Sequence, residues 1–225
     1  MDAVNLTQAL RQLSFAFLPV LMGLVLHELA HGYAANIMGD PTAKRHGRLT
    51  LNPLPHLSLY GSLFFLVTSF SSAAGGFPFI LGWAKPVPIN PRNFRNVRAA
   101  MILVSLAGAA ANLILAFIFT LIMYHLLLTD PHIDRAGFLF KTCQIGTLAN
   151  CVLAWFNLLP IPPLDGSKVL AGLMPAPLVR PYLSLERYGM IILILLLIPG
   201  WLGKLLIPLT IRTIEIYDSI IQWIF

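Results

Sequence analysis

Hydrophobic residues gather in long runs along this chain, and the polar residues lie between them. Four runs are long enough to cross a bilayer as helices, since a helix rises about 1.5 Å per residue. They cover residues 13–38, 99–128, 142–159 and 190–209. Gly39, Asp40 and Pro41 end the first run, while Pro199 and Gly200 interrupt the last. We therefore predict an all-α membrane protein, a polytopic helical bundle with about four spanning helices.

A fifth apolar run, residues 57–81, is broken by serine, glycine and proline. The next residues, 82–88, should be extended because residues before proline avoid the helix. Seven Lys/Arg residues lie in 39–98 and three in 160–189, but only two in 129–141. The positive-inside rule places the first two regions in the cytoplasm. A span over 57–81 would split the basic cluster between both faces, so we predict a re-entrant hairpin there, followed by the extended segment.

The composition supports a membrane protein. The chain has 225 residues, of which 57% are hydrophobic and 11% charged, with a mean hydropathy of +0.78. Soluble domains carry about 25% charged residues. The net charge of +6 is explained by cytoplasmic loops, and no basic run is interleaved with aromatic residues, so we expect no nucleic-acid partner. Cys143 and Cys151 lie eight residues apart on one predicted helix, too far for a disulfide.

The strongest chemical signal is His27-Glu28-Leu29-Ala30-His31, at the end of an uncharged run. Histidines at i and i+4 share one helix face and can bind one zinc ion, and the glutamate between them can act on a zinc-bound water molecule. Such a pattern is often accidental in soluble chains. Ionisable residues at membrane depth are costly, however, and they usually serve a function.

A catalytic zinc site needs a third protein ligand and an open position. Asp165 is the best candidate because it follows the proline-rich break 160–163, on the same side of the membrane as the histidines. Asp130 and Asp134 fall on the opposite side. Asp165 could also be a helix N-cap, or serve both roles.

Three further residues concern the surroundings of this site, and two of them have two interpretations each. Asn157 could cap backbone freed at the proline break or orient substrate. Gly108 and Asn112 lie in a small-residue stretch typical of close helix packing. Asn112 would then form an interhelical hydrogen bond or support the metal ligands from behind.

These residues resemble the site-2 proteases, the intramembrane zinc metalloproteases of peptidase family M50. The resemblance rests on the histidine motif and on residues 157–166, Asn-Leu-Leu-Pro-Ile-Pro-Pro-Leu-Asp-Gly, supported by residues 52–54, 82–88 and 108–112. It covers about residues 15–175 and is closest to the compact prokaryotic branch without a PDZ domain. One departure is Ala109, where the family commonly has proline. We expect a single domain over 1–225, in which 176–225 form a C-terminal helix and tail.

The resemblance implies one zinc ion held by His27, His31 and Asp165, with Glu28 as the general base. It also implies that an edge strand beside the site pairs with an extended substrate, and Asn157 would position that strand or the oxyanion. The edge residues are Gly82, Trp83, Ala84 and Val87. Around Val87 we expect unpaired backbone N–H and C=O groups that face the zinc.

The expected activity is hydrolysis of peptide bonds in membrane-embedded proteins. The enzyme would lie in the cell membrane, in contact with lipid, with its active site toward the cytoplasm. Two other classes remain open: a catalytically silent membrane protein that binds substrates, and a metal or proton transporter. A transporter would need further charged sites along a path, and the sequence contains one such cluster.

Overall fold

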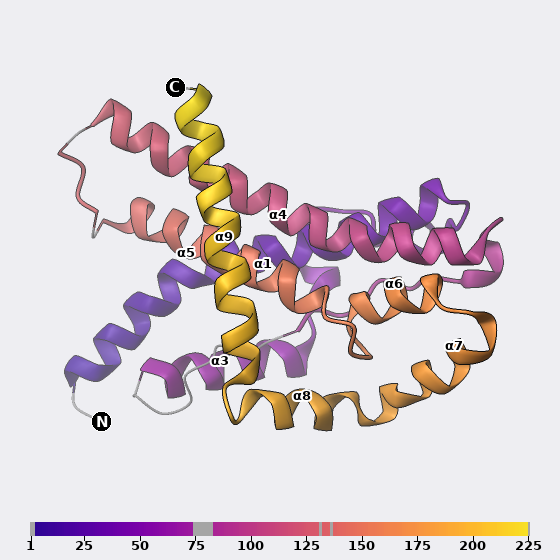
Figure 1. The fold of residues 1–225 in the computed structure, drawn as a ribbon. Helices are drawn as coiled ribbons and strands as arrows, with labels where there is room; N and C mark the ends of the chain where they lie inside the picture. Colours follow the sequence, from indigo (N-terminus) through magenta and orange to yellow (C-terminus); the bar gives the residue numbers. More distant parts are fainter. Residues whose placement is uncertain (1–2, 74–82, 131, 136, 225) are drawn as a thin grey trace.

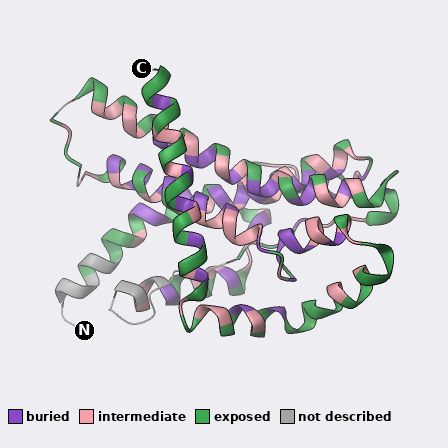
Figure 2. Cartoon of the chain, viewed as in Figure 1, coloured by how far each residue is buried: buried purple, intermediate pink, exposed green. Residues whose placement is uncertain are grey.

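Three helices form the centre of the molecule: α1 (Ala3–Ile37), α4 (Val97–Thr129) and α5 (Phe138–Asn157). The computed structural model describes residues 3–73, 83–130, 132–135 and 137–224. Each of the three helices packs against the other two (Figure 1). Buried positions concentrate along these contacts, whereas α7 (Ala176–Leu183) has no buried residue and α8 (Gly189–Leu197) buries only Gly189 and Leu193 (Figure 2). The predicted all-helical architecture is confirmed for the described residues.

Among the described residues, two helices are long and apolar enough to cross a membrane, namely residues Leu10–Ile37 of α1 and the whole of α4. They match the first and second predicted spans, and they mark the chain as a membrane protein. Asn96 begins α4, because its side chain accepts a hydrogen bond of 3.1 Å from the Ala99 N–H. Gly39 follows α1 with a φ of 106°, a conformation that favours glycine.

The predicted count of about four spans is not confirmed. In the described part of the chain, α5 is long enough at 20 residues but does not qualify by composition, since Lys141, Gln144 and Asn150 lower its hydropathy. The span predicted over 190–209, with its interruption at Pro199 and Gly200, is not confirmed as one straight helix. The α7–α8 region and α9 (Trp201–Ile224) meet at an 81° bend, so they count together as at most one broken span. Gly200, with a φ of 75°, lies at this bend.

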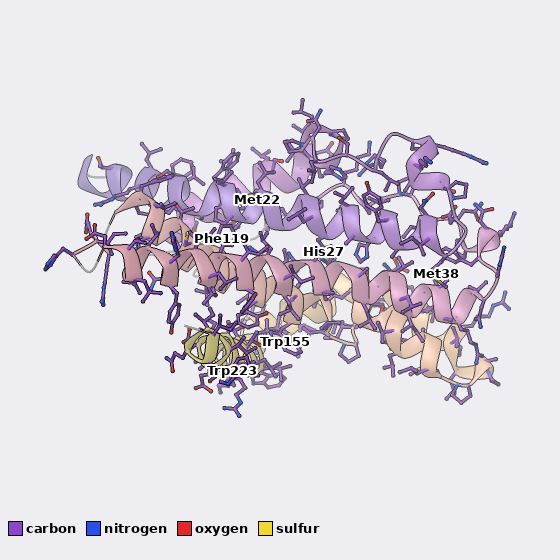
Figure 3. All side chains as sticks on the ribbon, turned by 90° about the horizontal axis from the view of Figure 1, so that it is seen from above. Met22, His27, Met38, Phe119, Trp155 and Trp223 are labelled. Atoms are coloured by element: carbon purple, nitrogen blue, oxygen red, sulfur yellow. The ribbon has the colours of Figure 1, made fainter. Side chains whose placement is uncertain are left out.

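Hydrogen bonds fix α9 across the central bundle. The Trp155 indole N–H donates to Thr213 Oγ1 over 2.9 Å, and the Tyr217 hydroxyl donates to the Leu113 carbonyl over 2.9 Å. These contacts join α9 to α5 and α4, and Figure 3 shows Trp155 close to α9. Helices in lipid gain little from the hydrophobic effect, so directional contacts of this kind contribute to their association.

The apolar run over 57–81 begins with α3 (Leu59–Ala73). Just before α3, Leu57 forms an antiparallel bridge with Ala84, and the Lys85 N–H donates to the His56 carbonyl over 2.7 Å. Residues 56–57 and 84–85, which flank the apolar run, therefore lie side by side, as the hairpin prediction requires. Residues 74–82, which would hold the tip of the hairpin and include Gly82, lie outside the described residues.

Asp40 joins the loop after α1 to the segment before α4. Its buried carboxylate accepts hydrogen bonds from the Asn90 N–H and the Asn93 Nδ2, both over 2.6 Å, and from the N–H and hydroxyl of Thr42. Burial raises the pKa of Asp40, but these hydrogen bonds lower it below its ordinary value of 3.8. The contact places loops 39–56 and 85–98 on one face of the molecule.

We expect Asp40→Ala to lower the free energy of unfolding by about 3 kcal/mol, because several donors lose a charged acceptor. Since folding lowers the pKa of Asp40, its contribution is complete above about pH 4 and declines as the pH falls through the folded pKa. Thermal unfolding of the detergent-solubilised protein at pH 7 and pH 3 measures both effects. Glu215→Gln is the control, as it removes an exposed ion pair with Arg212. Equal unfolding temperatures for wild type and Asp40→Ala at pH 7 would contradict the prediction.

Candidate metal centre

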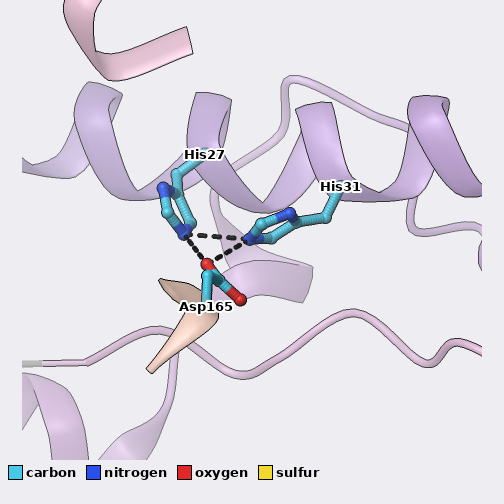
Figure 4. Close-up of side chains that lie close together, drawn as sticks. All are labelled: His27, His31 and Asp165. Atoms are coloured by element: carbon cyan, nitrogen blue, oxygen red, sulfur yellow. Dashed lines mark hydrogen bonds and ion pairs between the residues drawn. The ribbon is translucent and has the colours of Figure 1, made fainter. Parts of the chain in front are cut away.

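His27, His31 and Asp165 meet at one point between α1 and the start of α6 (Asp165–Leu173). One helical turn separates the two histidines on α1, so both imidazoles leave the same face. Asp165 Oδ2 lies 3.2 Å from His27 Nε2 and 2.9 Å from His31 Nε2, and the two Nε2 atoms are 3.0 Å apart (Figure 4). All three residues are at most 7% exposed.

Helix α4 determines which imidazole nitrogens face this point. His27 Nδ1 is 2.7 Å from Asn112 Oδ1, and His31 Nδ1 is 2.7 Å from the carbonyl oxygen of Val104. Both partners are oxygen acceptors, so each neutral imidazole donates from Nδ1 and keeps a lone pair on Nε2. Asn112 thus forms the interhelical hydrogen bond and also supports a candidate ligand from behind.

Three electron-pair donors therefore converge in a buried site. Zinc binds imidazole nitrogen and carboxylate oxygen at about 2.0–2.2 Å, which in a tetrahedron puts ligand atoms about 3.3 Å apart. The observed separations of 2.9–3.2 Å lie close to that value. The donor set fits a tetrahedral zinc ion, and three protein ligands leave the fourth position open.

The proline-rich break after α5 brings Asp165 to the site. Leu164 is the N-cap of α6 and Asp165 its first residue, with no side-chain capping bond, so the N-cap interpretation of Asp165 is wrong. Gly166 is required next to it, since a Cβ there would lie 2.1 Å from the Leu158 carbonyl oxygen. The backbone at Gly166 therefore lies directly against the end of α5, and this close approach sets the position of the Asp165 carboxylate.

Lys168 completes the environment of Asp165. Its ammonium group lies 3.0 Å from Asp165 Oδ1, which leaves Oδ2 directed at the histidines. Burial raises the pKa of Asp165, but its polar contacts with the two imidazoles and the nearby positive charge of Lys168 lower it well below its usual range. The carboxyl group is therefore ionised and suited to a cation. Lys168 is a residue that sequence reasoning missed, because a lysine three positions after an aspartate is common on any helix.

The three donors border a cavity of about 190 Å³. Glu28, Asn157 and Lys168 line the same cavity. Glu28 Oε2 accepts a hydrogen bond of 2.8 Å from the Val87 N–H. We expect from the sequence that this N–H is unpaired, and that expectation is wrong. The extended segment is thus tied to Glu28 through Val87. The backbone carbonyl of Lys85 is not free either, because it accepts a hydrogen bond of 2.6 Å from the Arg48 side chain.

The other predicted edge residues lie elsewhere. Trp83 and Ala84 line a separate apolar cavity of about 180 Å³ between α1 and α3, and the Trp83 ring contacts Phe64 at a centroid distance of 5.5 Å. Within the described residues, no hydrogen bond reaches the Ala84 N–H. Asn157 donates from Nδ2 to the Leu153 carbonyl over 2.9 Å, one turn back on α5.

Gly108 provides the space that the two imidazoles occupy. A Cβ at this position would lie 2.5 Å from His31 Cε1 and 2.7 Å from His27 Cε1. Figure 3 shows His27 between α1 and α4, where this close approach occurs. Any larger residue at 108 would displace the ligand side chains, so the glycine is part of the site.

Comparison with known proteins identifies the family. The chain is similar to two curated proteins whose names both begin "Putative zinc metalloprotease": YwhC of Bacillus subtilis and Rip2 of Mycolicibacterium smegmatis. It is 39% identical to YwhC over 186 residues, which are 82% of this chain and 80% of YwhC. It is 34% identical to Rip2, over 82% of this chain and 66% of Rip2. No family model and no solved structure matches the chain. By its similarity to YwhC, the chain belongs to the zinc metalloprotease family and is a zinc-dependent hydrolase.

Proposed function

We propose that this protein is an intramembrane zinc metalloendopeptidase of the site-2 protease type, peptidase family M50, which hydrolyses peptide bonds of membrane-embedded proteins. One observation carries the proposal: the buried donor set lies between α1 and the start of α6, against α4, so both membrane-length helices border it. A protease built this way acts on substrates that reach it through the bilayer. The alternative of a silent binding protein does not explain why Glu28 shares the cavity with the three donors.

In this proposal His27, His31 and Asp165 hold one zinc ion per chain. When bound, zinc polarises a carbonyl group and lowers the pKa of water. Glu28 takes a proton from the attacking water and returns it to the leaving amine. The Val87 N–H keeps the Glu28 carboxylate in the cavity, within reach of that water. Asn157 lines the same cavity and orients the substrate there.

The substrate would bind as an extended strand beside residues 83–87. A peptide bond inside a helix is shielded, so the enzyme must hold its substrate extended. Within the described residues the Ala84 N–H has no partner, and it offers one such hydrogen bond. The apolar cavity beside Trp83 and Ala84 suits the side chains of a membrane segment.

We place the protein in the cell membrane as a multi-pass protein with its active site toward the cytoplasm. The support is the basic charge of loops 39–56 and 85–98, which Asp40 brings to one face. The proposed partners are membrane-protein substrates and the surrounding lipid. We treat the chain as one domain, because α6 supplies Asp165 to a site built on α1 and α4.

We expect His27→Ala, His31→Ala and Asp165→Ala each to lower the zinc content of the purified protein well below one ion per chain. Each change removes one of three ligands and leaves too few donors for tight binding. Metal analysis after dialysis against a weak chelator gives the stoichiometry. The control is His56→Ala, which removes a buried histidine outside the donor set. One zinc ion per chain in Asp165→Ala would refute the third-ligand assignment.

Glu28→Gln should retain zinc and lower kcat by about 10³-fold, because the amide cannot accept the proton from water. Cleavage of a labelled membrane-spanning peptide in proteoliposomes measures the rate, and metal analysis of the same preparation confirms the zinc content. Zinc flux in these vesicles without any cleavage by the wild type would instead support a transporter. Wild-type protein that holds zinc but neither cleaves nor transports would support a silent binding protein.

Ala84→Pro should reduce kcat/KM about fivefold, which corresponds to the loss of one backbone hydrogen bond of about 1 kcal/mol to the substrate. Val87→Pro should cost more, because it removes the N–H that holds Glu28. Both variants should retain zinc. Ala84→Gly keeps the N–H and serves as the matched control. Wild-type cleavage rates in both proline variants would rule out the proposed strand.

A further inference from the structure

Three polar side chains from three different helices form a continuous chain of hydrogen bonds behind His27. His27 Nδ1 on α1 lies 2.7 Å from Asn112 Oδ1 on α4, and Asn112 Nδ2 donates to Asn150 Oδ1 on α5 over 2.9 Å. Asn112 and Asn150 are at most 1% exposed. Nothing in the sequence distinguishes Asn150 from other polar residues of an apolar helix.

We propose that Asn150 is a positioning residue, which fixes the tautomer of His27 by holding the amide of Asn112 in one orientation. The inference rests on the proposed role of His27 as a metal ligand. It extends that role to a residue that touches neither the metal ligands nor the cavity.

The direction of each hydrogen bond follows from its acceptor. Asn150 Nδ2 donates to the Gly146 carbonyl over 2.9 Å and to the Pro19 carbonyl over 3.3 Å. Carbonyl oxygens only accept, so this amide nitrogen must face them and Oδ1 must face Asn112. Asn112 Nδ2 then donates to Asn150 Oδ1 and to the Gly23 carbonyl over 3.1 Å. Both protons of each amide group are thereby used.

The remaining atom of Asn112 is its oxygen, and it faces His27. His27 must therefore donate from Nδ1, which leaves the lone pair of Nε2 for a metal ion. If Asn112 turned over, its N–H would meet Nδ1 and favour a proton on Nε2, where no metal could then bind. Asn150 opposes that flip together with the Gly23 carbonyl, because a reversed Asn112 would bring its oxygen against Asn150 Oδ1 at 2.9 Å and against the Gly23 oxygen at 3.1 Å.

Gly23 shows how closely the helices approach around this chain of residues. A Cβ at position 23 would lie 2.3 Å from Asn150 Oδ1 and 3.2 Å from Asn112 Nδ2. The glycine on α1 therefore makes room for the two amides, four residues before His27. In an apolar interior each of these polar groups would be costly without its partner.

The test compares Asn150→Leu with Thr147→Val in the full-length detergent-solubilised protein. Thr147 lies on the same helix and contacts Thr120 of α4 over 3.1 Å, so its replacement also removes a buried polar contact between α4 and α5, but not one in line with His27. We expect Asn150→Leu to raise the zinc dissociation constant about tenfold, as is typical for residues that orient metal-bound histidines. Thr147→Val should leave it unchanged. Asn150→Ala provides the same comparison if the leucine variant does not fold.

The tautomer itself supplies a readout that a merely structural role would not change. In protein labelled with ¹⁵N-histidine and freed of metal, the wild-type His27 signal should show the proton on Nδ1, and Asn150→Leu should show a mixture of tautomers. In a double-mutant cycle with Asn112→Leu, the second change should add little, because both residues act along one path. Additive losses, or a wild-type tautomer in Asn150→Leu, would overturn the proposal.

His27→Ala separates this inference from the assignment on which it rests. If His27→Ala retains zinc, the ligand assignment fails and the role of Asn150 fails with it. If His27→Ala loses zinc while Asn150→Leu binds it as tightly as Thr147→Val does, the ligand assignment stands and only the role of Asn150 is excluded.

Discussion

Three lone pairs that point at one another in a buried site are the constraint on which this structure depends. Two Nε2 atoms and a carboxylate oxygen, within 3.2 Å of one another, repel unless a cation lies among them, so the surrounding protein must hold each donor in place. Helix α4 holds both imidazoles through Asn112 and the Val104 carbonyl. Lys168 holds the second oxygen of the carboxylate. The packing of α1, α4, α5 and α6 can be understood as the means of fixing those donors.

Glu28 connects this centre to the rest of the cavity that His27, His31 and Asp165 line. Its hydrogen bond from Val87 ties the proposed base to the extended segment, and Asp40 ties the continuation of that segment to the end of α1. Arg48 and the His56 carbonyl hold Lys85 between these two points. The position of the base is therefore determined by a loop that is distant in sequence, and not by α1 alone.

Local patterns in the sequence predicted the elements that local rules determine. Long uncharged runs predicted α1 and α4, and the apolar run before the proline-rich break 160–163 predicted α5. The sequence also pointed to the three donors that the structure brings together. Pro199 and Gly200 marked the break before α9, although not its angle of 81°. The sequence could not predict the pairing of Val87 with Glu28, because that contact depends on packing between distant segments. Asn150 was missed for the same reason: its importance lies in what faces it across two helices.

The distance along the chain between the donors has a consequence for biosynthesis. His27 and Asp165 are separated by 138 residues, so ribosomes must add both long helices and α5 before the third donor exists. A nascent chain with α1 already in the membrane presents at most two of the three donors, and two imidazoles bind zinc far more weakly than a complete set. In the proposed site the set of zinc ligands is therefore complete only after α4 and α5 have been made, so a partly synthesised chain would lack the proposed activity.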